Sequence, residues 1–356
     1  MFPGQPGVLV SSARSKVVFK RVARGTPREI ESALASALSR IDLPEDAIGE
    51  RSLVKLNAMS DELFPGRNTS PWVVDAVLAW LRARFPRTAF RLVDTDVAGS
   101  KQFAQACKNW GYDRIASRHG VPIVNLSHAP VVTVKTKTSL VPELELPEAV
   151  VHASSIVNVP VLKTHVLSGI TCALKNHWGL LPRVRYRFHP MLSEVIAVMN
   201  SVIPQTVLNV LDGTVCIEGS GPKTGVPRIA NVLFASRDRV ALDSAVLDFI
   251  GMPRAMAPHV ARAAELGVGS AEYEIEGDVM VPEAFALPVQ SKDFVSLVEK
   301  KVRSIPIVGE IAYAPPIARV LGMIGTQYNK IVWMNLHGRR HIEAIRRHED
   351  YGVEFR

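Results

Sequence analysis

Residues 153–162, ASSIVNVPVL, form an apolar run that is typical of a buried strand. This strand is expected to present Lys163, Thr164 and His165 at its end. A Ser-Gly turn follows, and residues 169–178 are predicted to be helical. This strand and the helix after it are one unit in a series of alternating strands and helices. Further strands are predicted at 17–20, 52–56, 90–93, 122–126, 207–211 and 232–235.

Helices are predicted between these strands from capping residues and from apolar spacing. Thr26-Pro27 and Ser70-Pro71 each begin a helix, and further helices are expected at 100–110, 190–202 and 239–250. Because strands alternate with helices, the sequence predicts an α/β fold with a mostly parallel sheet flanked by helices. We assign residues 15–285 to this α/β domain and residues 286–356 to a C-terminal helical appendage.

The composition is that of a folded, non-fibrous protein. Of the 356 residues, 47% are hydrophobic and 21% are charged, which excludes a disordered chain. Three cysteines are too few for a disulfide scaffold, so a reducing compartment is expected. The N-terminus lacks the pattern of a signal peptide, and no apolar run is long enough to span a membrane. These features predict a cytoplasmic protein.

The net charge of +8, from 42 Lys and Arg against 34 Asp and Glu, is spread along the chain. Because the sequence patterns of zinc fingers, basic zippers and RNA-recognition domains are absent, no nucleic-acid partner is predicted. The densest basic stretch, residues 339–347, is interleaved with Glu343 and is interpreted as a solvated helix face. Docking of this tail on a partner or peripherally on a membrane is the alternative.

The polar residues that follow strands define the candidate site, because ligands of open parallel sheets bind beyond the carboxyl ends of the strands. Lys163 follows one strand, and Lys175 lies one helical turn after Thr171. The two amines are therefore expected to flank one pocket. An anion clamp is the leading interpretation. The alternatives are a catalytic lysine, acting as a base or as a carbonyl-capturing amine, and lysines that are only structural.

His165 is interpreted as a proton-transfer group, with a structural histidine as the alternative. A metal site formed by the histidines of this region and Cys172 is disfavoured, because their spacing matches no common zinc pattern. Residues 183–189 alternate basic side chains, and in an extended segment Arg187 would face the same side as two other arginines. Arg187 and His189 are therefore candidates for contact with a phosphate or carboxylate.

A glycine-rich segment, residues 212–225, follows the strand predicted at 207–211. Asp212 is a candidate for polarising or holding a substrate group, with an Asp-Gly turn as the alternative. Gly219 and Gly221 would let the backbone approach a ligand closely, although the spacing is neither that of a P-loop nor that of a dinucleotide-binding loop.

Other polar residues also end predicted strands. Lys55 and Asn57 follow one strand, and Asp94 and Asp96 follow another. Asp243 lies inside an apolar helix and is expected to point inward toward a Lys or Arg. The residues assigned to substrate binding are Lys55, Asn57, Thr164, Thr171, Asn176, Arg187, His189, Asp212, Gly219 and Gly221.

Several of these segments together resemble the domain-of-unknown-function family 362, over residues from about 50 to 255. Many members of that family carry a ferredoxin-like group of cysteines. Cys107, Cys172 and Cys216 are too far apart for such a group, so the resemblance implies the α/β fold and a shared pocket without an iron–sulfur centre. The similarity is carried by Lys55 with Asn57, Thr69-Ser70-Pro71, Pro-Val-Leu-Lys-Thr-His (160–165), Thr-Cys-Ala-Leu-Lys-Asn-His-Trp-Gly (171–179), Asp-Gly (212–213), Glu-Gly-Ser-Gly-Pro (218–222) and Asp-Arg-Val-Ala-Leu-Asp (238–243).

The leading hypothesis is an enzyme for a small phosphate- or carboxylate-bearing substrate, in a specialised biosynthetic or cofactor pathway. Lys163 and Lys175 would hold the anion and His165 would transfer protons. A non-catalytic redox or metal-binding accessory protein, with ligands such as Asp212 and Glu218, is the alternative. The sequence identifies no cofactor, reaction or oligomeric state. The groups expected to orient the substrate are Thr171, Asn176 and Asn57.

Overall fold

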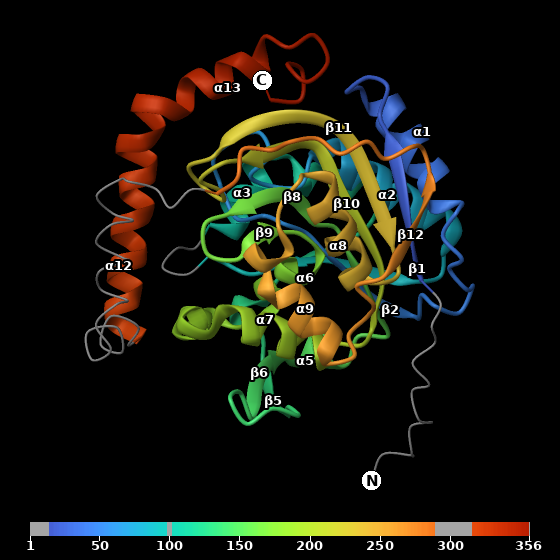
Figure 1. The fold of residues 1–356 in the computed structure, drawn as a ribbon, viewed down its shortest axis with the longest axis vertical. Helices are drawn as coiled ribbons and strands as arrows, with labels where there is room; N and C mark the ends of the chain where they lie inside the picture. Colours follow the sequence, from blue (N-terminus) through green and yellow to red (C-terminus); the bar gives the residue numbers. More distant parts are fainter. Residues whose placement is uncertain (1–13, 98–101, 289–314, 356) are drawn as a thin grey trace.

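The computed structural model describes residues 14–97, 102–288 and 315–355. Within these residues one large sheet has the strand order β12-β1-β11-β10-β7-β2-β3-β4, and β8 and β9 branch from β10. A separate two-stranded hairpin, β5–β6, projects from the domain (Figure 1). The strands of the large sheet are β1 Ser15–Arg21, β2 Arg51–Lys55, β3 Ala89–Asp94, β4 Ile123–Asn125, β7 Ser155–Asn158, β8 Val161–His165, β9 Gly169–Thr171, β10 Thr206–Glu218, β11 Val226–Ser236 and β12 Tyr273–Gly277; the hairpin strands are β5 Val131–Lys135 and β6 Glu143–Pro147.

Most neighbouring strands of the sheet run parallel, as the sequence predicts. The row β10-β7-β2-β3-β4 is parallel throughout, and β8 is parallel to β10. Antiparallel pairing occurs where β11 meets β1 and β10, and between β8 and β9. The parallel row brings the carboxyl ends of β2, β3 and β7 to one edge of the sheet, which is where ligands of such sheets bind.

Helices cover both faces of the sheet and enclose two apolar cores. Helices α1 to α4 pack on one face, where Ile30, Val77 and Ile115 are buried. Helices α6 to α9 pack on the other, where Val195 and Val246 are buried. The result is the α/β fold predicted from the sequence (Figure 1). The helices are α1 Pro27–Leu38, α2 Pro71–Arg84, α3 Phe103–Asn109, α4 Tyr112–Arg118, α5 Glu148–Val151, α6 Ala173–Asn176, α7 Leu192–Ser201, α8 Arg239–Phe249 and α9 Pro258–Glu265.

The helix starts that the sequence predicts are confirmed where they can be checked. Thr26 Oγ1 accepts a hydrogen bond from Glu29 N at 3.4 Å, and Ser70 Oγ accepts one from Val73 N at 3.5 Å. Each helix begins with the proline that follows its cap, because that position needs no backbone N–H donor. The helix expected at 100–110 begins at Phe103, and its first two positions lie outside the described residues.

The strand predicted at 153–162 is interrupted in the structure and becomes β7 and β8. Pro160 lies between them and cannot donate a ladder hydrogen bond, whereas its carbonyl accepts one from Asp212 N at 2.8 Å. Strand β10 therefore pairs first with β7 and then with β8. The break is what carries Lys163 and His165 beyond the end of β7 and out to the sheet edge.

Two other predictions about local structure are wrong. Residues 169–178 are not one helix, because Thr171 pairs with Lys163 in the β8–β9 ladder and α6 begins only at Ala173. The strand predicted at 207–211 does not end at Asp212. It continues to Glu218 with a change of register after Gly213, since β11 pairs with its second half.

The C-terminal helical segment consists of α12 Pro315–Tyr328, the π-helical stretch η5 Asn329–Gly338 and α13 Arg339–Arg346, and it lies along one side of the domain (Figure 1). The chain then returns to the main core, where Tyr351 and Phe355 are buried. The described end of the chain is therefore part of the domain's packing. The boundary at 285/286 stays a prediction, because residues 289–314 lie outside the described residues.

The basic tail predicted to be a solvated helix face is exposed at Arg339, Arg340 and Arg347. Arg346 instead donates a hydrogen bond from Nε to the Phe355 carbonyl at 2.8 Å. Docking of this tail on a partner or membrane stays a prediction. None of the helices in the described parts of the chain is both long and apolar enough to cross a membrane.

Candidate functional site

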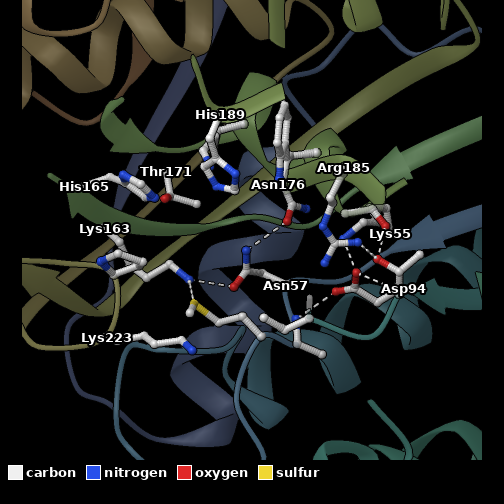
Figure 2. A pocket seen from close by; sticks show the side chains of 18 residues that line it. Lys55, Asn57, Asp94, Lys163, His165, Thr171, Asn176, Arg185, His189 and Lys223 are labelled. Carbon is white, nitrogen blue, oxygen red and sulfur yellow. Dashed lines mark hydrogen bonds and ion pairs between the residues drawn. The ribbon is translucent and has the colours of Figure 1, made fainter. Parts of the chain in front are cut away.

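A pocket of about 210 Å³ lies at the carboxyl ends of β2 and β3, where β8, β9 and α6 meet them (Figure 2). Lys55 and Asp94 are the last residues of β2 and β3, and both contribute to its wall. Lys163, His165 and Lys175 line the same pocket, so the structure brings the three together as the sequence analysis expected. Of the other predicted residues, Asn57, Thr171, Asn176 and His189 also line it.

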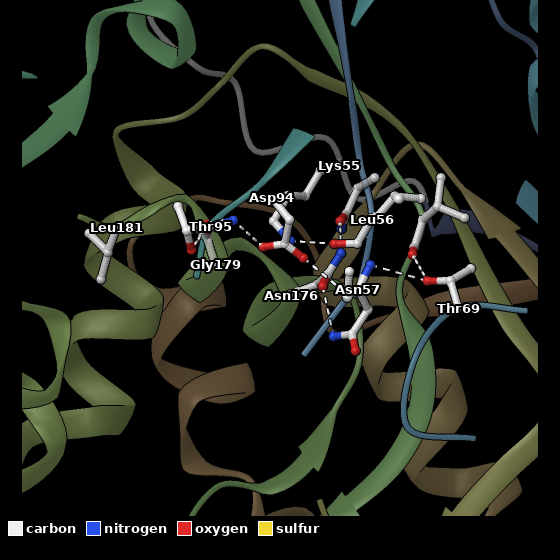
Figure 3. Close-up of polar contacts among 12 residues, drawn as sticks. Lys55, Leu56, Asn57, Thr69, Asp94, Thr95, Asn176, Gly179 and Leu181 are labelled. Atoms are coloured by element: carbon white, nitrogen blue, oxygen red, sulfur yellow. Dashed lines mark hydrogen bonds and ion pairs between the residues drawn. The ribbon is translucent and has the colours of Figure 1, made fainter. Parts of the chain in front are cut away.

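Lys55 and Asp94 form a buried ion pair, with Nζ 3.0 Å from Oδ1 (Figure 3). The remaining lone pairs of Asp94 accept backbone hydrogen bonds from Ala58 N at 2.9 Å and Thr95 N at 2.7 Å. Burial lowers the pKa of Lys55, and the neighbouring Asp94 carboxylate opposes that shift. Gly179 packs against the pair so closely that a Cβ there would lie 2.6 Å from Asp94 Oδ1. Lys55 and Asp94 therefore neutralise each other, and little of their charge is left to bind a ligand.

Lys163 is completely buried and uses its amine on protein acceptors. Its Nζ lies 2.7 Å from Asn57 Oδ1, 2.7 Å from the Arg67 carbonyl and 3.2 Å from Met59 Sδ. Burial lowers the pKa of Lys163 well below its usual value, and the charge of Lys175 lowers it further. These three contacts occupy the hydrogens of the amine whether or not it is protonated, so none is left for a ligand.

Four asparagine amides continue from Lys163 in a single hydrogen-bonded chain through the ends of the strands. Each amide accepts at Oδ1 and donates from Nδ2 to the next member, with distances of 2.8 to 3.1 Å beyond Asn57. A chain of hydrogen bonds that all point the same way is mutually polarised. The order is Lys163, Asn57, Asn176, Asn158, Asn209 and the Ser236 carbonyl.

Lys175 and Lys223 differ from Lys55 and Lys163. Within the described residues, neither of their amines has a hydrogen-bond acceptor. Lys175 Nζ lies 5.3 Å from the centre of the Trp178 ring. Burial and the Arg185 charge lower the pKa of Lys175 to about 7, and burial with Arg67 lowers that of Lys223 to about 8. The pocket therefore contains two amines available to a ligand, and only Lys175 was singled out from the sequence.

His165 is held in one tautomer by its own turn. Its Nδ1 accepts hydrogen bonds from Leu167 N at 3.0 Å and Ser168 N at 3.3 Å. Burial, and secondly the charge of Lys175, lower the pKa of His165 well below its usual value. The ring is therefore neutral with its hydrogen on Nε2, and it can act as a hydrogen-bond donor. A role in proton transfer stays a prediction.

Five of the residues assigned to substrate binding lie outside the pocket wall. Thr164 donates to the Gly219 carbonyl at 2.8 Å, and Gly221 packs against the Thr164 carbonyl. Arg187 is exposed, 3.8 Å from Glu145, because residues 183–191 form 3-10 turns rather than an extended segment. The residues with no place in the lining are Thr164, Arg187, Asp212, Gly219 and Gly221.

Two acidic residues with predicted functions instead stabilise the fold. Asp212 accepts hydrogen bonds from Ser70 N at 2.7 Å and from Thr214 N at 2.9 Å, so it joins β10 to the start of α2. Asp243 points toward backbone rather than toward a Lys or Arg, accepting from Ala173 N at 2.7 Å and Leu174 N at 3.1 Å. The first backbone N–H groups of α6 thus already hold a carboxylate.

Three important lining residues were missed or left unassigned. Arg185 donates to the Asp96 carbonyl at 2.8 Å and forms one side of the pocket. Trp178 lies beneath Lys175, and Lys223 belongs to the glycine-rich segment. The position of Lys223 just after Gly221-Pro222 was a usable signal, but nothing local in the sequence shows that this loop folds over β8.

The residues that the sequence analysis considered as metal ligands do not lie together in the described structure. Within the described part of the chain, no group of three or more His, Cys, Asp or Glu side chains is arranged to hold a metal ion. Glu218 pairs with Arg228 at 3.1 Å, and Cys172 is fully buried with a pKa raised by burial. The geometry therefore favours ligand contact through cationic and neutral donors.

Comparison with known proteins places the chain in a family. It is 28% identical over 248 residues to the thylakoid-associated protein sll1697 of Synechocystis sp., covering 64% of this chain and 71% of that protein. Among solved structures, the lactate racemase apoprotein of Thermoanaerobacterium thermosaccharolyticum (TM-score 0.43, 13% identity) aligns with 64% of this chain and 55% of its own. A protein from Thermotoga maritima aligns with a TM-score of 0.40 and 14% identity, over 68% of this chain and 58% of the Thermotoga chain. The family model described as Domain of unknown function (DUF362) matches residues 53–248, more than half of the chain, so this protein belongs to that family.

Proposed function

We propose that this protein is an enzyme that acts on a small molecule bearing a carboxylate or phosphate, bound in the pocket at the sheet edge. The charge balance of the wall supports this. In the described residues the lining contains one carboxylate, that of Asp94, and it is already paired with Lys55. Five lining side chains are lysines or arginine: Lys55, Lys163, Lys175, Lys223 and Arg185.

The observation that carries the proposal is the set of hydrogen-bond donors that the protein leaves unused. Lys175 and Lys223 lack acceptors among the described residues, as does the Nε2–H of His165. Thr171 adds a hydroxyl to the same wall. None of these donors is among the buried side-chain atoms that lack a partner in the described residues, so each is open to the pocket and available to a ligand rich in acceptor oxygens. Carboxylates and phosphates have this chemistry.

An enzyme is favoured over a simple binding protein by the state of Lys175. An amine whose pKa is lowered to about 7 exchanges its proton near neutral pH, which suits a base or a nucleophile. The site also lies in a concave part of the protein lined mostly by buried side chains, where electrostatic interactions with a reacting group are stronger than in bulk water.

The test is ligand-dependent thermal melting at constant ionic strength, with sodium phosphate, oxalate and pyruvate as probes and acetamide as a neutral probe. We expect at least one anion to raise the melting temperature of the wild type, and acetamide to have no effect. Replacing Lys175 or Lys223 by Met removes a charge-assisted hydrogen bond worth ~1.5–3 kcal/mol, so apparent affinity should fall roughly 10- to 100-fold.

The matched control is Lys137→Met, because Lys137 is exposed in the loop between β5 and β6. This variant should respond to the anions as the wild type does. If no anion shifts the wild type, or if all three variants respond alike, the proposed binding site is wrong.

A further inference from the structure

Lys175 has surroundings unlike those of the other buried lysines. Lys55 is paired with Asp94, and Lys163 donates to Asn57 and to a backbone carbonyl. Lys175 is only 9% exposed, yet its amine lies over the face of the Trp178 ring, 5.3 Å from the ring centre. Its amine lines the pocket with no acceptor among the described residues, and it is open to the pocket rather than sealed in the core, so a ligand can reach it.

The backbone that carries Lys175 is tightly positioned. Ala173 N and Leu174 N both donate to the Asp243 carboxylate, at 2.7 and 3.1 Å. On the other side of Lys175, the Asn176 side chain is held between Asn57 and Asn158. Because the residues before and after it are both anchored, the amine is presented to the pocket from a preorganised element, as reacting groups in enzymes are.

The electrostatic surroundings favour a neutral amine at this position. Arg185 and Lys163 flank the same pocket, and the lining carboxylate, Asp94, is committed to Lys55. Burial and the Arg185 charge lower the pKa of Lys175 to about 7. Near pH 7 a substantial share of Lys175 is then unprotonated, whereas an ordinary lysine is almost entirely protonated. A neutral amine is a nucleophile, whereas an ammonium is not.

On this geometry we propose that Lys175 forms an imine with the carbonyl carbon of a small aldehyde or ketone that also carries a carboxylate or phosphate. The proposal deepens the proposed function and rests on it. The C–N bond forms as Nζ adds to the carbonyl carbon. The C–O bond then breaks, and the carbonyl oxygen leaves as water with the two amine hydrogens, so no oxidant or reductant is needed.

The other donors of the wall have complementary tasks in this scheme. The Nε2–H of His165 and the Thr171 hydroxyl can donate hydrogen bonds to the carbonyl oxygen as it leaves. Lys223 has a pKa of about 8 and is mostly protonated at neutral pH, so it is suited to bind the anionic group of the same ligand. One amine is then a nucleophile and the other a cation.

The experiment is reductive trapping on the full chain. Protein is incubated with pyruvate or with dihydroxyacetone phosphate, treated with sodium borohydride, and analysed by intact mass and peptide mapping. We expect one reduced adduct, on Lys175, and several-fold more of it at pH 8 than at pH 6. The two compounds show whether the site prefers a carboxylate or a phosphate. Lys137→Met should be trapped as the wild type is.

Lys175→Arg separates the imine from anion binding, because it retains a cation but cannot form an imine with a carbonyl compound. It should lose the adduct completely while its melting temperature still rises with oxalate. If oxalate stabilises the wild type but no adduct forms, or if the adduct maps to another lysine, the imine is wrong and the proposed function stands. If neither an anion shift nor an adduct is found, both fail.

Discussion

Lys163 Nζ lies 2.7 Å from Asn57 Oδ1, although the two residues are 106 positions apart in the sequence. This contact sets the direction of the whole amide chain. Lys163 Nζ donates to the Asn57 oxygen, which turns the Asn57 NH₂ toward Asn176. At the far end the Ser236 carbonyl can only accept, so Asn209 must present its NH₂ there. Both ends therefore require the same orientation, and the chain fixes the elements that form the pocket.

The first prediction concerns the direction of this chain and uses Asn158→Asp. Asn158 Nδ2 donates to the Ala173 carbonyl and to Asn209 Oδ1, both at 3.0 Å. A carboxylate would place oxygen against two acceptors in a buried site, so we expect a loss of ~3–5 kcal/mol in the free energy of unfolding. Urea denaturation measures it. Asn335→Asp, at an exposed asparagine, should change stability by less than ~0.5 kcal/mol. If the two substitutions destabilised the protein equally, the proposed direction of the asparagine hydrogen-bond chain would be wrong.

The second prediction concerns pH and Lys175. Its pKa is about 7 in the folded protein, against 10.5 for an unperturbed lysine, so between these values the unfolded chain binds a proton that the folded chain has lost. Stability from this group therefore rises with pH across that window, by up to ~1.4 kcal/mol per pH unit. Below pH 7 both states are protonated and the buried ammonium is a constant cost.

The measurement compares urea midpoints and slopes of the wild type and Lys175→Met from pH 6 to pH 10. Lys175→Met should be the more stable protein at pH 6, and its advantage should shrink as the pH rises. Parallel pH profiles for the two proteins would show that the amine is not shifted.

The third prediction concerns the close approach of Gly179 to the Lys55–Asp94 pair. A Cβ at this position would lie 2.6 Å from Asp94 Oδ1 and 2.8 Å from Lys55 Nζ. Because these side chains are buried and bonded elsewhere, Gly179→Ala should cost ~1–3 kcal/mol and weaken oxalate binding in the adjacent pocket. Gly325→Ala, in α12 with open space around the added atom, should be neutral or stabilise by up to ~1 kcal/mol. Thermal melting distinguishes the two.

The fourth prediction concerns the end of the chain. Tyr351 is fully buried, stacks near Trp72 and donates to Asn231 Oδ1 at 2.6 Å. Tyr351→Ala should therefore cost about 3–5 kcal/mol, as for other buried aromatic residues. Val353→Ala, two positions away at a side chain that is 66% exposed, should change stability by less than ~0.5 kcal/mol. A small effect of Tyr351→Ala would mean that the segment around Tyr351 does not pack into the core.

Some errors of the sequence analysis have a common physical origin. Residues 169–171 were predicted to begin a helix after a Ser-Gly turn, yet they pair with β8 across that turn. Asp212-Gly213 has the composition of a turn, yet β11 pairs alongside it and extends the strand. In both cases a partner strand supplied hydrogen bonds that outweighed the local preference.

Pocket residues at the ends of strands were predicted more successfully than pocket residues in loops. Lys55, Asn57 and Lys163 were found because polar residues that follow buried parallel strands meet at one edge. Arg187 and Gly219 were misplaced, because their assignments assumed loop conformations that short-range patterns do not determine. Lys223 reaches the pocket only because its loop folds over β8.

The order of residues along the chain was enough to indicate the strand and helix alternation, the caps at Thr26 and Ser70, and the edge at which a ligand would bind. These depend on hydrophobic periodicity and on hydrogen bonds between near neighbours. The partners of each buried amine were decided by tertiary structure alone. Asn57 occupies the hydrogens of Lys163, whereas Lys175 meets an aromatic ring, because burial makes charge and hydrogen bonding depend on groups that are distant in sequence.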